Sequence, residues 1–179
     1  MNPLLALPDW NGLHPAMIHF PIALLLVAPL FVLLGTFLPR EKARVFLMGA
    51  LILMLLGTLA MFVARSTGQA SAKQVERTPA VAALIEQHEE LAETTSIVFA
   101  LLTAIFAAVV YGVRLVQQTR ATVLATLLPL VFLLLYGAGA VLLVDTAHRG
   151  GRLVHEFGVR AFMPPPGSPV AAVRPQPDK

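Results

Sequence analysis

The sequence predicts an all-α integral membrane protein, a four-helix bundle. Of its 179 residues, 57% are hydrophobic and only 13% are charged, which leaves too little polar surface to cover a soluble core. The apolar residues are concentrated in four runs, each close to the roughly 20 residues that a helix needs to cross a bilayer. We expect the spans at about 16–38, 45–64, 88–113 and 122–145.

Basic residues in the short connections predict the orientation. The turn after the first span and the turn after the third carry these side chains: Arg40, Lys42, Arg44, Arg114 and Arg120. Lys and Arg in short loops favour the cytoplasm, so we expect both turns there. The N- and C-termini are then both periplasmic (N-out, C-out), in a multi-pass protein of a bacterial inner membrane.

The connection between the second and third spans is expected to contain the start of a helix. Thr78 followed by Pro79 is typical of an N-cap and a first helical position. From there, helical spacing places His88 on an apolar face, away from the neighbouring glutamates. Residues 1–160 therefore form one four-transmembrane-helix domain, and the proline-rich segment 161–179 is predicted to be an extended tail.

Composition excludes several kinds of chemistry. The absence of cysteine rules out disulfides, thiolate metal sites, cysteine-ligated iron–sulfur clusters and covalent haem attachment. The net charge of +3 is spread without a dense basic block, so no nucleic-acid partner is expected. No nucleophile–base pair or phosphate-binding loop is visible. An electron-transfer subunit is therefore favoured over a stand-alone enzyme.

The five histidines are the main functional signal. On the predicted topology all of them lie at the periplasmic face: His14, His19, His88, His148 and His155. Ionisable residues beside membrane spans tend to mark functional sites, and imidazole binds haem iron and metal ions. We expect a non-covalent haem b at this face, with a histidine-bound copper or zinc as the alternative. Taken one at a time, each histidine can also be interpreted as a hydrogen-bonded residue at the membrane interface that binds no cofactor.

His19 and His88 are the predicted axial ligands. His19 is about one turn deeper than His14, and Pro21 leaves the carbonyl of Met17 without a donor, so the backbone can bend there and turn His19 inward. His14 is expected to cap the helix or to approach a haem propionate.

The remaining predicted site residues follow the fourth span or flank the second. His148 is expected to be a further ligand, oriented by Asp145 three residues before it, and a metal ion would use His19, His88 and His148. His155 would fold back over the site. Three cations are expected to meet the propionates: Arg65, Arg149 and Arg152.

Glycines within the second and fourth spans have two interpretations. They allow either close helix packing, the favoured interpretation, or close approach of a flat macrocycle. These glycines are Gly49, Gly57, Gly137 and Gly139.

The opening stretch His14-Pro15-Ala16-Met17-Ile18-His19-Phe20-Pro21-Ile22-Ala23-Leu24 resembles a signature of four-helix bacterial membrane proteins, catalogued as domain of unknown function 2231. His88 and the stretch Gly150-Gly151-Arg152-Leu153-Val154 are similar to two further family elements. The family pattern continues with tyrosine and, two residues later, histidine. Here His155 and Phe157 stand at those positions, so His155 is displaced from the family's histidine.

The resemblance implies association with c-type cytochrome or Rieske domains, and hence electron transfer at the outer face. Together with the histidines, it predicts a cytochrome b-like membrane subunit. This subunit would exchange electrons with a periplasmic redox partner, a larger membrane redox complex or quinone. The competing hypothesis is a non-catalytic structural subunit of a larger membrane complex, in which the histidines only form hydrogen bonds.

Overall fold

The computed structural model describes residues 10–118 and 122–159, and all of its regular secondary structure there is helical. The predicted tail 161–179 and Arg120 lie outside the described residues. The elements are η2 (Trp10–Gly12), α1 (His14–Met17), α2 (His19–Phe37), α3 (Arg40–Ala72), α4 (Pro79–Gln118) and α5 (Thr122–His155).

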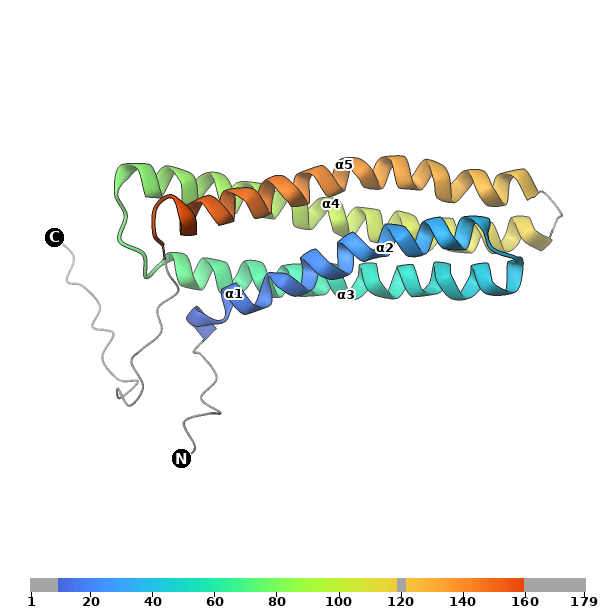
Figure 1. The fold of residues 1–179 in the computed structure, drawn as a ribbon, viewed down its shortest axis with the longest axis horizontal. Coiled ribbons are helices and arrows are strands. Elements are labelled where there is room, and N and C mark those ends of the chain that lie inside the picture. Colours follow the sequence, from blue (N-terminus) through green and yellow to red (C-terminus); the bar gives the residue numbers. More distant parts are fainter. Residues whose placement is uncertain (1–9, 119–121, 160–179) are drawn as a thin grey trace, which may run out of the picture.

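The four long helices form two antiparallel hairpins that pack side by side (Figure 1). α2 packs along α3, and α4 packs along α5, while contacts of α3 with α4 and of α2 with α5 close the bundle. The predicted all-α four-helix bundle is therefore confirmed. Both ends of the described chain, Trp10 and Val159, belong to the same end of the bundle, which also holds the starts of α1 and α4. We call it the histidine end, and the opposite one the turn end.

All four long helices are long and apolar enough to cross a membrane. α2 has 19 residues, which at about 1.5 Å per residue matches the roughly 30 Å hydrocarbon core of a bilayer. α3 and α4 are much longer, with 33 and 40 residues. The helices that follow α2 therefore extend several turns beyond a single bilayer thickness.

The second helix continues past its predicted end at residue 64. α3 runs to Ala72, so the connection to α4 comprises only residues 73–78 rather than a segment of about twenty residues. The apolar run indicates which part of the helix lies in the hydrocarbon core of the membrane, but it does not indicate where the helix ends. Beyond that run, Thr67 is fully buried, and the Ser71 hydroxyl donates to its carbonyl at 3.0 Å.

The start of α4 is as predicted. The helix begins at Pro79, and the Thr78 hydroxyl accepts a hydrogen bond of 3.4 Å from the N–H of Val81. The first turns of α4 then build a small apolar cluster with the end of α5. Its buried members are Val81, Leu84, Ile85 and Leu153.

A break separates α1 from α2 at Ile18. The Ile18 N–H still donates to the carbonyl of His14 at 3.1 Å, but Pro21 has no N–H to offer to the carbonyl of Met17. One turn of helix is therefore interrupted between His14 and His19. Ile18 keeps right-handed helical dihedral angles, φ −63° and ψ −26°, and the inward turn of His19 expected from Pro21 is not seen.

The core is a column of aromatic and aliphatic side chains along the bundle axis. Phe99 and Tyr136 meet edge to face with ring centroids 5.5 Å apart, and Phe106 lies 4.6 Å from Phe132. All four rings are buried. They come from α4 and α5, so this hairpin supplies most of the large aromatic volume of the core.

Three of the four glycines in the spans serve helix packing. A β-carbon at Gly57 would lie 2.7 Å from Leu25, and one at Gly139 would lie 2.6 Å from Leu102. Gly49 similarly accommodates Phe31 at 3.0 Å. Nothing lies within 4 Å of such an atom at Gly137. The packing interpretation therefore holds for the glycines that have a close neighbour.

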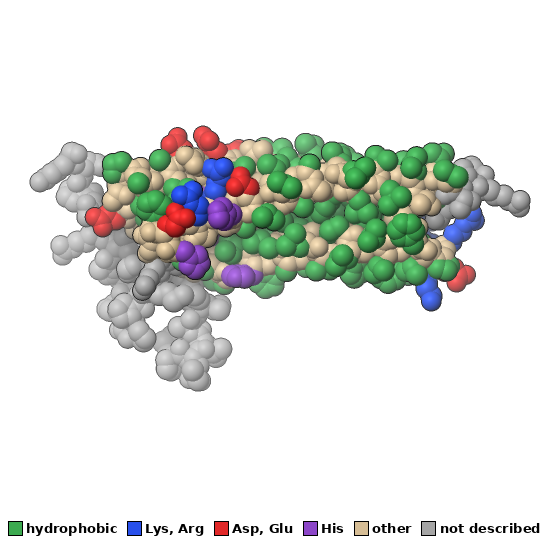
Figure 2. Space-filling model, turned by 45° about the horizontal axis from the view of Figure 1, so that its top comes forward, with side chains coloured by type: hydrophobic (Ala, Val, Ile, Leu, Met, Phe, Trp, Pro, Cys, Tyr) green, Lys and Arg blue, Asp and Glu red, His purple; other side chains and the backbone are tan. Residues whose placement is uncertain are grey.

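The outer surface separates apolar from charged side chains along the bundle. Figure 2 shows hydrophobic side chains over most of its length, with charged groups gathered at the ends and histidines at only one of them. Many large aliphatic side chains are exposed there, including Leu134 at 80% and Val141 at 69%. Such a surface is stable against lipid tails and not against water.

Candidate functional site: two histidines at one end of the bundle

His14 is the first residue of α1, and its ring packs on α3. Its Nδ1 lies 2.8 Å from the carbonyl oxygen of Ala64 and 3.3 Å from the hydroxyl of Thr67. A carbonyl can only accept, so Nδ1 carries the proton and donates. In the neutral ring, Nε2 then keeps its lone pair. Gly68 makes room for the ring, because a β-carbon there would lie 2.9 Å from Cε1 of His14.

His88 lies on α4 and packs on α5 in a similar way. A β-carbon at Gly150 would lie 3.1 Å from its Cε1, so that glycine leaves space for the imidazole. The backbone of Thr146 is a nearby polar group, but Nδ1 of His88 is buried without a hydrogen-bond partner. Among the described residues it is the one buried side-chain nitrogen or oxygen without a partner.

The two imidazoles lie near enough to act on each other electrostatically. They are brought together by separate parts of the bundle. In the described part of the chain, α1 packs against α2, α3 and η2, and it does not approach the backbone of α4 or α5. His14 and His88 thus lie at the same end of the bundle, on helices whose backbones do not contact each other.

Contrary to the prediction, the side chain of His19 does not face the interior of the bundle. Its side chain is exposed, and its Nδ1 donates to the carbonyl of Pro15 at 2.7 Å. Two residues five positions apart on a helix of about 3.6 residues per turn point about 140° apart, so His14 and His19 do not share a face. The prediction chose His19 because it lies deeper along the helix. In the structure the direction of each side chain around the helix decides, and it is His14 that points toward α3.

His148 and His155 are both exposed at the end of α5. Asp145 does not orient His148, because its carboxylate accepts hydrogen bonds from Arg149 at 3.3 and 3.4 Å. Within residues 10–118 and 122–159, no group of three or more His, Asp or Glu side chains is placed to hold a metal ion. The predicted trio of His19, His88 and His148 therefore does not form a cluster.

The three arginines predicted near a haem propionate are paired with protein groups. Arg65 forms a 2.7 Å ion pair with Glu93, which joins α3 to α4. Arg149 binds Asp145 on its own helix and donates to Gln87 of α4 at 3.0 Å. These contacts tie three helices together just beside the histidines.

The third arginine, Arg152, pairs with Glu156 at 2.9 Å. The hydrogen bond from Arg152 holds the pKa of the Glu156 carboxyl below its ordinary value. Each of these three arginines thus has an acidic partner. The pairs of Arg149 and Arg152 have i,i+4 spacing, whereas the pair of Arg65 with Glu93 joins two helices and does not follow from spacing.

A family model for a predicted membrane protein, DUF2231, matches residues 11–162. The chain belongs to this family. No curated protein and no solved structure matches the chain.

The DUF2231 signature residues have distinct structural roles. His14 contacts α3, Pro15 lies in the first turn of α1, and Pro21 is buried three residues after the break. Gly150, the first glycine of the second signature, is the residue on which the His88 ring lies. One element thus places His14 on α3, and the other gives space to His88, both at the histidine end.

Sequence reasoning missed the α3 residues that receive His14: Ala64, Thr67 and Gly68. The predicted second span ends at residue 64, so Thr67 and Gly68 lie outside it. The sequence did contain an indication of their role, because Thr67 and Gly68 continue the helical spacing of the apolar residues in the second span. It could be used only once the helix was known to extend beyond residue 64.

Proposed function

We propose that this protein is a membrane electron-transfer subunit that binds haem b at the histidine end through His14 and His88. The observation that carries the proposal is the pairing of two half-buried imidazoles on different helices, each against a glycine. Haem iron would supply one-electron transfer. The protein side of this chemistry is the orientation and protonation of the two rings.

The hydrogen bonding of His14 suits a ligand. Histidines that bind a metal usually donate their other ring N–H to a carbonyl or carboxylate, which fixes the ring and its tautomer. The contact of Nδ1 with the carbonyl of Ala64 at 2.8 Å is of this kind. It leaves Nε2 available for iron.

The unsatisfied nitrogen of His88 also favours a bound group. Leaving a buried polar atom unpaired costs about 1–3 kcal/mol. Coordination of iron at the other ring nitrogen, Nε2, would place the proton on Nδ1, on the ring that lies near the backbone of Thr146.

The basic residues of the turn between α2 and α3 support the proposed orientation in the membrane. Arg40, Lys42 and Arg44 lie at the turn end, opposite the histidines. With that end in the cytoplasm of a bacterial inner membrane, the histidines face the periplasm. A c-type cytochrome, a Rieske protein or a larger membrane redox complex would then be the partner, with quinone as another electron carrier.

The test is the pigment and metal content of the protein purified from membranes in mild detergent. We expect a reduced-minus-oxidised spectrum with b-type bands and about one haem per chain by pyridine haemochrome assay. A colourless protein with stoichiometric copper or zinc by elemental analysis would replace haem with a metal site. A protein with neither would contradict both.

The second candidate is a structural subunit of a larger membrane complex. The ion pairs favour it, because Arg65, Arg149 and Arg152 already have acidic partners and are not free to bind propionates. On this hypothesis the substitution His14→Ala weakens assembly of the complex although the purified wild-type protein is colourless. Native gel electrophoresis of solubilised membranes measures that assembly.

A further inference from the structure

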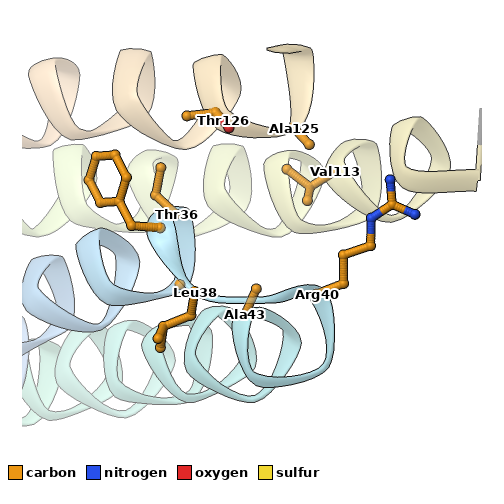
Figure 3. A pocket seen from close by; sticks show the side chains of 9 residues that line it. Thr36, Leu38, Arg40, Ala43, Val113, Ala125 and Thr126 are labelled. Atoms are coloured by element: carbon orange, nitrogen blue, oxygen red, sulfur yellow. The ribbon is translucent and has the colours of Figure 1, made fainter. Parts of the chain in front are cut away.

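A pocket of about 300 Å³ lies at the turn end (Figure 3). The histidines gather at the opposite end of the bundle (Figure 2). Residues from the ends of all four long helices line it. Thr36 and Phe37 come from α2, Arg40 from α3, Val113 from α4 and Ala125 from α5. The pocket therefore opens between the two hairpins.

The position of the pocket matches the boundary of the bilayer. It lies at the last turn of α2, a helix whose 19 residues measure about one hydrocarbon thickness at about 1.5 Å per residue. Phe37 is 68% exposed, so its ring is open to the membrane beside the pocket. A ligand here would have apolar groups toward the bilayer core and polar groups toward water.

Arg40 is the cation of this pocket. Figure 3 shows its side chain beyond Val113 and Ala125, toward the end of the bundle. It has no hydrogen-bond or ion-pair partner among the described residues, unlike the arginines at the histidine end. Its helix also begins after Pro39, which provides no side-chain cap for the first backbone N–H groups of α3.

Neighbouring charges add to the positive potential. Lys42 and Arg44 follow on the first turns of α3, Arg114 lies near the end of α4, and Glu41 is the single acidic residue beside them. Free backbone N–H groups, the positive end of a 33-residue helix and an unpaired guanidinium all favour a phosphate. The apolar lining from Phe37 and Val113 favours an acyl chain beside it.

We propose that this pocket binds the phosphate of an anionic phospholipid, with Arg40 as its principal contact. The headgroup occupies the space between the two hairpins, and the adjoining acyl chain lies along the exposed end of α2. The site is independent of the histidine pair, so either can fail without affecting the other.

The substitution Arg40→Gln tests this site, and Arg44→Gln is its matched control. Both remove one positive charge from the start of α3, and both side chains are exposed, but only Arg40 lines the pocket. The measurement is the titration of purified protein in detergent with dioleoyl phosphatidylglycerol, followed by native mass spectrometry. We expect Arg40→Gln to weaken binding about fivefold, the effect of one cation near an anionic headgroup, and Arg44→Gln to change it less than twofold.

A second variant, Ala125→Leu, fills the pocket without changing charge. It is expected to lower phosphatidylglycerol binding while the melting temperature of the protein stays within a few degrees of wild type. Equal effects of Arg40→Gln and Arg44→Gln would overturn the proposal in favour of diffuse attraction. Equally tight binding of dioleoyl phosphatidylcholine would overturn the role of anionic charge. Competition by inorganic phosphate at the same concentration as the lipid would overturn a lipid as the ligand.

Discussion

The hydroxyl of Tyr136 on α5 donates a 2.6 Å hydrogen bond to the backbone carbonyl of Leu25 on α2. In a regular helix that carbonyl would accept from the N–H four residues later, but the residue there is Pro29, which has none. The phenol thus satisfies a carbonyl that proline leaves free in the middle of the bundle. This contact explains how α2 tolerates an internal proline.

Tyr136→Phe is expected to destabilise the protein by about 1 kcal/mol, because it leaves a buried carbonyl without a donor. Tyr111→Phe is the control, since that hydroxyl belongs to a side chain that is 64% exposed. In a Pro29→Ala background the Ala N–H would bind the Leu25 carbonyl, so Tyr136→Phe should cost less there. The unfolding free energy in mixed micelles measures both effects. Equal costs in the two backgrounds would show that the hydrogen bond does not depend on the proline.

Gly150→Ala is expected to displace the His88 ring, since the added carbon would lie 3.1 Å from its Cε1. Gly151→Ala is the matched control, because no atom lies within 4 Å of the carbon added there. The control should stabilise α5 by up to about 1 kcal/mol through helix propensity, whereas Gly150→Ala should lose that gain. Thermal unfolding compares the two. A melting temperature raised equally by both substitutions would mean that His88 does not need the space.

The ion pair of Arg65 and Glu93 is expected to contribute little stability. Their side chains are 27% and 54% exposed, and partly exposed pairs typically contribute about 0–1 kcal/mol. A double-mutant cycle of Arg65→Gln and Glu93→Gln should therefore give a coupling below about 1 kcal/mol, which falls further in high salt. A coupling that does not respond to salt would indicate that the pair is buried in the membrane-bound protein.

Periodicity and composition were enough to predict the architecture. The four apolar runs correspond to the four long helices, and the Thr78-Pro79 pair marks the first turn of α4. Helix ends beyond the membrane could not be predicted from hydrophobicity, because the α3 residues after 64 are polar in sequence but helical in structure. Their burial depends on α1, which is distant in the chain.

The candidate site was predicted only in part. His88 lies on the inward face as its spacing on α4 indicates, and all five histidines belong to one end of the bundle. The prediction of His19 as a ligand used its depth along the helix, but its ring is exposed in the structure, whereas the ring of His14 packs on α3. Partners such as Glu93 for Arg65 are contacts between helices, and spacing along one chain does not specify them.

The central claim is that His14 and His88, and not His19, form the interior site. The most direct measurement compares the haem absorbance per purified chain in His14→Ala, His88→Ala and His19→Ala with that of wild type. We predict that the first two variants lose most of the haem absorbance, while His19→Ala, whose exposed ring bonds to Pro15, retains it. Loss of absorbance in His19→Ala together with its retention in His14→Ala would contradict the account.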